Sequence, residues 1–289
     1  MEQRIRLMSH NVWNRDDNSS DWEKIGCDCS AKARVSGLVR VYKDTMPDII
    51  GCQESSALMA DLLKQEFEKE NMKYTIIWGR FTPIIYNSDK FELVDSEFLT
   101  YPEHIDGFVG EFNDVKSKAY NLGVFRHKQS GKLFIFATTH LWWMQSPNDN
   151  LFSQGSSYRE NSDEAREYQL ALLTNKTKEY VKKYNCPAFV VGDMNTDYNS
   201  KAIQSALSSG FKHAHDIASE YAEEKIGYHN CFPWGFETKY FDSPFEKAID
   251  HILVYNEKNG SVKRFERYSP DYYFPISDHS AVYIDVELW

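Results

Sequence analysis

The chain has 289 residues, a formal net charge of −10 and 42% hydrophobic residues, which is enough apolar surface for a sizeable core. It contains no run of five basic residues, which disfavours a dedicated nucleic-acid binder, although net charge can hide a local basic patch. The first residues lack an apolar signal region and no apolar run of about 18 residues follows, so we expect a soluble, cytoplasmic protein without a membrane span unless a leader has been removed.

Strands and helices alternate along the first half of the chain. Residues 31–46 carry apolar side chains at helical spacing, and Pro47 ends that helix because proline lacks the N–H that a further turn needs. A second helix is predicted at residues 57–70. The strands predicted in this half span residues 4–13, 48–54, 74–78, 83–86, 91–94, 120–126 and 133–140.

The second half begins with a long helix predicted at residues 162–184, where Asn161 and Glu164 have the spacing of a capping box. The later predicted elements are a strand at 187–193, a short helix at 199–207 closed by Gly210, and strands at 248–254, 262–268 and 281–288. Segments 143–161 and 212–246 are long and irregular. Loops of that length inside a compact domain are usually functional.

The order of these elements predicts the fold class. No internal repeat or linker divides the chain, so we predict a single domain over residues 1–289. A sheet rich in hairpins, with helices between its halves, differs from a strictly alternating parallel fold. An α/β arrangement fits better, in which two βαβ-like halves pack their sheets face to face with the helices outside.

Polar side chains gather where the predicted strands end. Residues i and i+2 of a strand share a face, so we expect Asp193 and Asn195 to point together, and Asp278 and His279 to diverge. Strand ends that meet at one edge of a sheet are a common way to assemble a site. The candidates are Asn11, Glu54, His140, Asp193, Asn195, Asp250, Asp278 and His279.

This set of side chains suits the hydrolysis of a phosphoester. Glu54 and Asp278 are hard oxygen ligands of the kind that Mg²⁺ or Mn²⁺ takes. Asp193 is the best candidate for the carboxylate that orients the attacking water. Asn195 and His140 can donate hydrogen bonds to nonbridging oxygens in the transition state.

A histidine that is held by a carboxylate keeps one tautomer and can stay protonated, and His279 with Asp250 is a candidate for such a pair. Each candidate also has a structural explanation, such as a turn for Asp193 or a helix N-terminal charge for Glu54. We prefer the functional interpretation because all eight residues stand at strand ends in one chain.

The motifs that carry these residues resemble those of a known family. In order, they are MSHNVWN, PDIIGCQES, TTHLWW, VVGDMNTD, KAIDHILV and ISDHSAVYIDVEL, and together they cover nearly the whole chain. The chain resembles the endonuclease/exonuclease/phosphatase superfamily of metal-dependent phosphohydrolases. The resemblance implies a four-layer αββα sandwich with two mixed β-sheets and a site at one edge of both sheets.

The resemblance also implies a role for each candidate. Glu54, supported by Asn11 and Asp278, would bind the metal, while Asp250 would orient His279. Phosphate contacts would come from Asn195, His140 and His279. Asp193 would align or deprotonate the nucleophilic water. Whether the aspartate or the histidine is the base, and whether one metal ion or two are bound, stays open.

The substrate is less well defined by the sequence. The leading interpretation is an Mg²⁺- or Mn²⁺-dependent phosphatase or phosphodiesterase that acts on a small or modest-sized phosphoester. The alternative is a DNA or RNA nuclease, and a sphingomyelinase-like phospholipid hydrolase or a non-catalytic binding protein is less favoured. The Trp-Cys-Asp-Arg element of inositol phosphatases is absent at residues 247–250, which counts against that branch. Oligomeric state stays open.

Aromatic residues are concentrated before Asp250 and after His140. Residues 232–245 are rich in rings, and Trp143 closely follows His140. We expect Trp143 and Trp234 to stack on a ring of the substrate, with His229 and Lys239 as polar contributors. The alternative is that these rings pack the loop against the sandwich.

Overall fold

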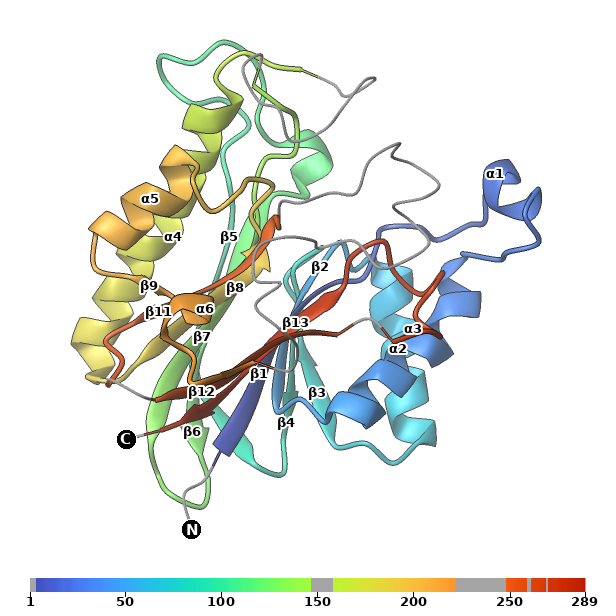
Figure 1. Ribbon diagram of the computed structural model, residues 1–289, viewed down its shortest axis with the longest axis horizontal. Helices are drawn as coiled ribbons and strands as arrows, with labels where there is room; N and C mark the ends of the chain where they lie inside the picture. Colours follow the sequence, from blue (N-terminus) through green and yellow to red (C-terminus); the bar gives the residue numbers. More distant parts are fainter. Residues whose placement is uncertain (1–3, 147–157, 222–247, 259–260, 269, 289) are drawn as a thin grey trace.

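The computed structural model describes residues 4–146, 158–221, 248–258, 261–268 and 270–288 (Figure 1). Two mixed sheets pack face to face, and helices cover the outer face of each sheet. The α/β class and the four-layer αββα order that the sequence predicted are therefore confirmed. Among the described helices, none combines the length and the apolar character that crossing a membrane requires.

The first sheet has seven strands in the order β10-β12-β13-β1-β2-β4-β3. At its centre, β1 (Arg4–Asn11) runs parallel to β2 (Ile49–Gln53) and antiparallel to β13 (Ala281–Glu287). Helices α2 (Ala31–Thr45) and α3 (Ala57–Lys69) cover its outer face. The other strands are β3 (Tyr74–Ile77), β4 (Ile84–Asn87), β10 (Glu220–Tyr221) and β12 (Val262–Tyr268).

The second sheet has six strands in the order β5-β6-β7-β8-β11-β9. Here β7 (Leu133–His140) and β8 (Ala188–Asp193) are parallel, and β11 (Asp250–Tyr255) is antiparallel to β8. Helices α4 (Ser162–Tyr184) and α5 (Lys201–Ser208) cover this sheet. The remaining elements are β5 (Phe91–Thr100), β6 (Ala119–His127), β9 (Lys212–His213), α1 (Ser20–Glu23), η1 (Asp114–Lys116) and α6 (Ala214–Ile217).

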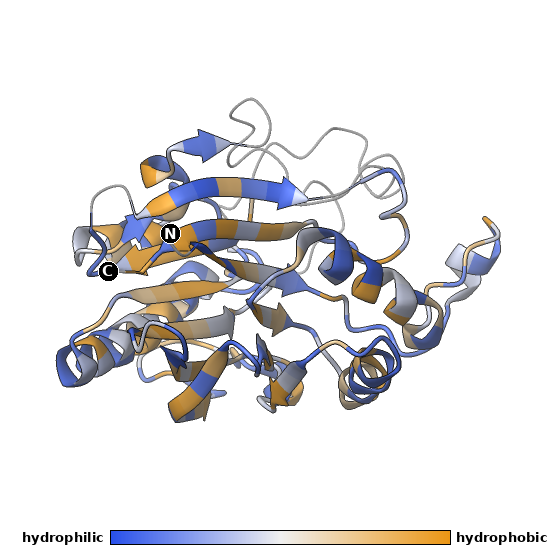
Figure 2. Ribbon diagram, turned by 90° about the horizontal axis from the view of Figure 1, so that it is seen from below, coloured by the Kyte–Doolittle hydropathy of each residue, from blue (hydrophilic) through white to orange (hydrophobic). Residues whose placement is uncertain are grey.

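The core lies in three layers of buried apolar side chains, one between the sheets and one beneath each pair of helices. In β2, Ile49 packs between the sheets whereas Ile50 packs beneath α2 and α3, as the alternation of a strand requires. Figure 2 shows the apolar strands enclosed between more polar outer layers. The sheets approach closely at Gly51, where a Cβ atom would lie 2.6 Å from Thr138 Cβ.

Most predicted elements begin and end within a few residues of the observed ones, but three predictions need correction. The capping box at Asn161 is wrong, because this residue has a φ of 61° and its Oδ1 accepts a hydrogen bond from the N–H of Val109 instead. Segment 212–246 is not irregular throughout, since its described part forms β9, α6 and β10. Strand β5 also extends to Thr100, further than predicted. The single-domain division stays a prediction.

Candidate active site

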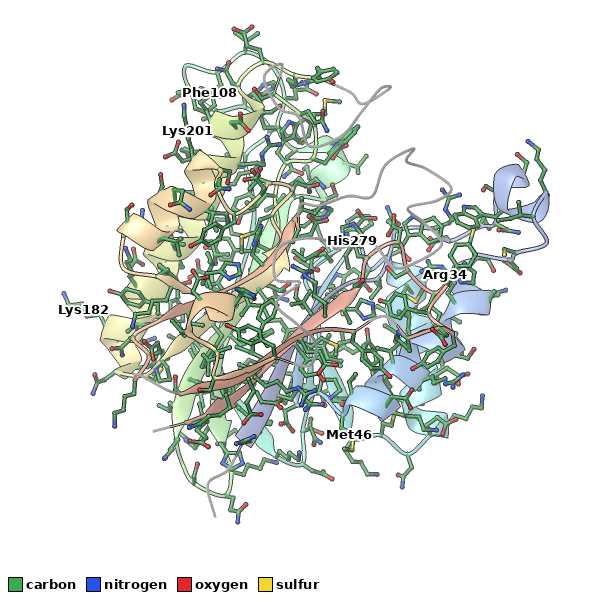
Figure 3. All side chains as sticks on the ribbon, viewed as in Figure 1. Arg34, Met46, Phe108, Lys182, Lys201 and His279 are labelled. Atoms are coloured by element: carbon green, nitrogen blue, oxygen red, sulfur yellow. The ribbon has the colours of Figure 1, made fainter. Side chains whose placement is uncertain are left out.

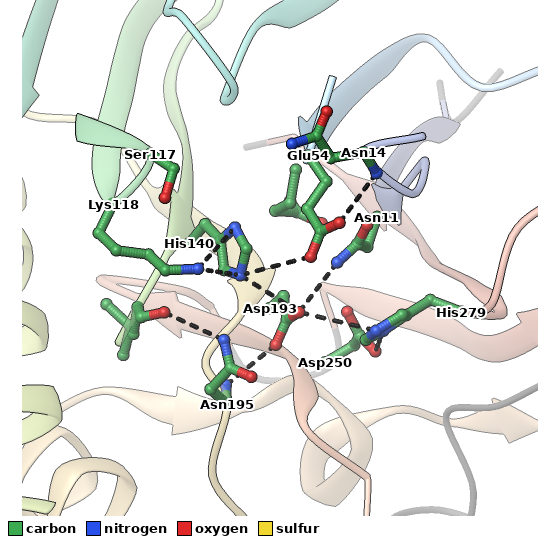
Figure 4. A network of polar contacts seen from close by, with 12 residues as sticks. Asn11, Asn14, Glu54, Ser117, Lys118, His140, Asp193, Asn195, Asp250 and His279 are labelled. Carbon is green, nitrogen blue, oxygen red and sulfur yellow. Dashed lines mark hydrogen bonds and ion pairs between the residues drawn. The ribbon is translucent and has the colours of Figure 1, made fainter. Parts of the chain in front are cut away.

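Six strands from both sheets bring the predicted polar residues together. In the second sheet, Asp193 at the end of β8 lies opposite His140 of β7 on one side and Asp250 of β11 on the other. From the first sheet, Asn11 ends β1 and Glu54 follows β2, while His279 precedes β13. Figure 3 shows His279 beside the start of β13, and Figure 4 shows the polar network that results.

The Asp193 carboxylate lies at the centre of this network. Asn11 Nδ2 donates to its Oδ2 at 2.9 Å, and the N–H of Asn195 donates to its Oδ1 at 3.0 Å. Nε2 of His140 and Nε2 of His279 lie 3.6 Å and 3.8 Å from Oδ2. Burial raises the pKa of Asp193 to about 6, since the buried carboxylate has less solvation for its charge. The carboxylate is therefore available as a proton acceptor near neutral pH.

His279 forms a buried pair with Asp250, the pairing that the sequence suggested. Its Nδ1 lies 2.8 Å from Oδ2 of Asp250, which leaves Nε2 facing Asp193. Burial opposes a charge on the ring, but the carboxylates of Asp250 and Asp193 outweigh it and hold the pKa of His279 well above its ordinary value. The imidazole is thus a protonated donor at neutral pH.

Glu54 and Asp278 offer carboxylate oxygens beside this network. Glu54 has a φ of 58°, a strained backbone conformation for a residue with a side chain, and its Oε2 accepts a hydrogen bond from the N–H of Asn14 at 2.9 Å. Asp278 is half-buried, but its Oδ1 is inaccessible and meets no hydrogen-bond donor among the described residues. Burial, and then the nearby Glu54 carboxylate, raise the pKa of Asp278 to about 7.

This arrangement fits a divalent cation. A buried carboxylate oxygen without a donor, next to a second carboxylate, is stabilised by a hard metal ion. Ligand atoms of Glu54, His140 and Asp193 also lie within 4.8 Å of one another. Asn11 uses both ends of its amide within the protein, because its Oδ1 accepts the N–H of Trp13 and its Nδ2 donates to Asp193.

Asn195 is held next to Asp193 by the backbone. It has a φ of 50°, and its Nδ2 donates to the carbonyl of Leu141 at 3.0 Å. His140 is buried, and burial together with the charge of a neighbouring lysine keeps its pKa well below the ordinary value. His251, next to Asp250 in the chain, faces away and contacts His213 and the carbonyl of Thr196.

Of the predicted substrate-contacting residues, only Trp143 lies in the described part of the chain. Its side chain is 38% exposed, whereas its neighbour Trp142 is buried against Phe112. Nε1 of Trp143 donates to Oδ2 of Asp114 at 2.9 Å, which fixes the orientation of the indole ring. His229, Trp234 and Lys239, together with segment 232–245, lie outside the described residues.

Two residues near the site were missed by sequence reasoning. Lys118 precedes β6 and its Nζ lies 2.8 Å from Nε2 of His140. Arg34 of α2 donates to five backbone carbonyls, those of Val12, Trp13, Arg15, Cys29 and Ile276. A signal for Arg34 existed, because it shares the buried stripe of α2 with Val35 and Leu38. By these bonds it joins the loop after β1 to the loop that carries Asp278 (Figure 3).

Comparison with known proteins gives one family. The sequence profile of the Endonuclease/Exonuclease/phosphatase family matches residues 8–279. A search of curated proteins found no match.

Several solved structures have the same fold. An endonuclease/exonuclease/phosphatase family protein from Bacteroides thetaiotaomicron is 22% identical with a TM-score of 0.73, covering 99% of this chain and 95% of that one. A mannosyl-6-phosphatase from the same species is 22% identical with a TM-score of 0.68 and 99% of each chain covered. D. rerio TDP2 complexed with single strand DNA product is 17% identical, with a TM-score of 0.64, covering 98% of this chain and 99% of that one.

Proposed function

Because this chain belongs to the endonuclease/exonuclease/phosphatase family, whose members hydrolyse phosphoesters, we propose that it hydrolyses a small or modest-sized phosphoester by attack of water on phosphorus. One observation carries the proposal. The buried Asp193 carboxylate lies between the ring nitrogens of His140 and His279, at 3.6 Å and 3.8 Å, and accepts a hydrogen bond from Asn11. A carboxylate in this position can hold a water molecule against a phosphoryl group that the flanking side chains bind.

The protonation states favour Asp193 as the base. His279 keeps its proton because Asp250 and Asp193 raise its pKa, so it cannot also accept one from water. Asp193, with a pKa of about 6, is largely ionised at pH 7 and can take that proton. His279 then donates from Nε2 to a nonbridging oxygen, while Asp250 keeps the ring in the required tautomer. Asn195 Nδ2 donates one N–H to Leu141, and its second N–H is a further donor for the phosphoryl group.

Glu54 and Asp278, with Asn11 beside them, are the residues that would hold Mg²⁺ or Mn²⁺. When bound, the metal would polarise a phosphoryl oxygen and neutralise part of its charge. The donor set supports this assignment, because Oδ1 of Asp278 is buried without a hydrogen bond from any described residue. Oxygen ligands of this kind favour Mg²⁺ or Mn²⁺ over softer metals.

The net charge of the chain favours a small substrate over a polynucleotide. A net charge of −10 opposes close contact with a polynucleotide, which favours a small ester over the nuclease alternative. Trp143 is exposed and follows His140 by three residues, so its ring is available to stack on a ring of the substrate. The fold alone does not distinguish a small ester from a polynucleotide as substrate, since a mannosyl-6-phosphatase and a protein bound to DNA product both have this fold.

A substrate panel tests the proposal. Purified protein with Mg²⁺ or Mn²⁺ is assayed against sugar phosphates, nucleotides, phosphodiesters, phospholipids and oligonucleotides, with EDTA as the metal-free control. We expect metal-dependent release of phosphate or alcohol from small esters. Cleavage of oligonucleotides alone, with a steep loss of rate at high salt, would favour the nuclease. No turnover of any ester with either metal would contradict the proposal.

A further inference from the structure

Lys118 is a buried cation beside the network, in a position that the proposed function does not yet use. The residue is 3% exposed, and its Nζ lies 2.8 Å from Nε2 and 3.4 Å from Nδ1 of His140 (Figure 4). No carboxylate of the described residues lies within ion-pair distance of its Nζ. Burial of an ammonium group without a paired carboxylate is costly, so a buried lysine of this kind needs an explanation.

The backbone around Lys118 is arranged to hold it there. Its N–H donates to Oδ1 of the buried Asn113, and its carbonyl accepts from Nδ2 of Asn113 and from the N–H of Tyr101, all at 2.8–2.9 Å. Between Asn113 and Lys118 the chain turns through Val115 and Lys116, whose φ angles of 42° and 57° are strained for residues with side chains. The next residue, Ala119, pairs with His140 across β6 and β7.

The contact with His140 fixes which atoms can donate hydrogen bonds. An ammonium group has three N–H donors and no acceptor, so Nε2 of His140 must accept from Lys118 and carries no proton of its own. The low pKa of His140 agrees with a neutral ring. His140 therefore cannot donate from Nε2 to a phosphoryl oxygen while Lys118 is charged. The free donors on this flank belong to Lys118, and one histidine acceptor leaves two of them for a ligand.

The charge of Lys118 is placed where a phosphoryl group would meet it. Burial lowers its pKa, but the carboxylates of Glu54 and Asp193 oppose this and favour the charged form. Figure 4 shows Lys118 and His140 on one side of Asp193, with His279 on the other. A phosphoryl group above Asp193 would thus have a cationic donor on each flank.

We propose that Lys118 is a catalytic residue that binds a phosphoryl oxygen directly and makes the site selective for phosphomonoesters over phosphodiesters. This inference rests on the proposed function and names its substrate class. A monoester presents three nonbridging oxygens and a charge of about −1.5 to −2 at pH 7, whereas a diester presents two such oxygens and a single charge. The third oxygen and the extra charge need a further charged donor, which Lys118 supplies.

The test compares two esters with the same leaving group, p-nitrophenyl phosphate and bis(p-nitrophenyl) phosphate. The wild-type protein should prefer the monoester. Lys118→Met should lower kcat/KM for the monoester about 100-fold, the scale of removing one oxyanion donor, and should lower it less than tenfold for the diester. Lys118→Arg should keep part of the preference. Lys64→Met, which removes an exposed charge on α3, is the matched control and should behave as wild type.

Four outcomes would overturn the inference about Lys118. These are a wild-type preference for the diester, an equal loss on both esters, no loss on either, and a Lys64→Met variant that loses the preference. If Lys118→Met does not fold by circular dichroism, the preference is read from Lys118→Arg and Lys118→Gln. If the wild type hydrolyses neither ester, the proposed function is contradicted for these esters. In that case, calorimetry measures the affinity of the wild type and of the Lys118→Met variant for inorganic phosphate. Equal affinities would overturn the inference that Lys118 binds a phosphoryl oxygen.

Discussion

Nδ1 of His279 lies 2.8 Å from Oδ2 of Asp250, and the two residues come from different sheets, since Asp250 begins β11 and His279 precedes β13. The pair therefore links the two layers of the sandwich at the site. It also directs Nε2 of the same ring toward Asp193. The protonation of His279 depends on the alignment of the two sheets.

Replacement of Asp250 by Asn removes the charge that raises the pKa of His279. We expect kcat/KM to fall about 100-fold at pH 8, because the ring loses its proton and with it a charged donor. The loss should be smaller at pH 6, since protons remain available to the ring, so the alkaline limb of the pH–rate profile moves to lower pH. A parallel drop at all pH values would contradict this explanation.

Replacement of Asp193 by Asn should remove turnover while metal and ligand binding persist, because the lost function is activation of water. In the wild type, kcat/KM should rise with pH through about 6 as the carboxylate becomes ionised. Asp61→Asn, an exposed position on α3, is the charge-matched control. Near-normal turnover of the Asp193→Asn variant would exclude Asp193 as the base.

The contribution of Asp278 to the stability of the metal-free protein should fall as the pH rises. The folded pKa of Asp278 is raised to about 7 from an unfolded value of 3.8, so its stabilising effect is complete below the unfolded pKa and is lost as pH rises through the folded pKa. Asp278→Asn should remove this effect and increase the free energy of unfolding in EDTA at pH 8 by about 2 kcal/mol. Urea titrations at pH 5 and pH 8 measure it. An unchanged pH dependence of the free energy of unfolding in the Asp278→Asn variant would contradict this prediction.

Replacement of Glu54 by Gln should weaken metal binding by at least about tenfold, the loss that even an indirect ligand partner causes. Excess Mg²⁺ or Mn²⁺ should partly restore the rate, since the variant still folds around the other ligands. Glu68→Gln changes the same charge at an exposed position of α3 and should leave the metal requirement unchanged. Calorimetric titration with Mn²⁺ measures the metal affinity of both variants, and an affinity of Glu54→Gln equal to that of Glu68→Gln would contradict Glu54 as a metal ligand.

Trp143 offers a test of whether an exposed ring near His140 contacts the substrate. Trp143→Ala should raise KM about tenfold for substrates with a ring beside the phosphoryl group, the scale of one stacking contact. Trp143→Phe should keep most of the affinity, because it retains a ring and loses only the hydrogen bond to Asp114. If KM stays constant in the Ala variant while the melting temperature falls, the ring serves packing alone.

The positions of the strand ends could be predicted because each strand is an apolar run that stops at a polar residue, as in β7 ending at His140 and β8 ending at Asp193. The role of Lys118 could not be predicted, since it depends on the pairing of Ala119 with His140 across two strands. The capping box failed at Asn161 for a similar reason. Oδ1 of Asn161 accepts a hydrogen bond from the N–H of Val109, which is distant in the sequence, and not from an N–H of its own helix.

The pairing of β1 with β13 sets the order in which the site can be completed. Arg4 lies opposite Glu287, so the central strand of the first sheet gains this neighbour only after almost the whole described chain is available. Contacts between such distant segments form slowly, because a long loop must close first. While β13 is undocked, Glu54, His140 and Asp193 have their strands, but His279 is missing. On the proposed mechanism, a nascent or partly folded chain would therefore hold the carboxylate of Asp193 before the donor of His279, and we expect it to be inert until β13 has docked.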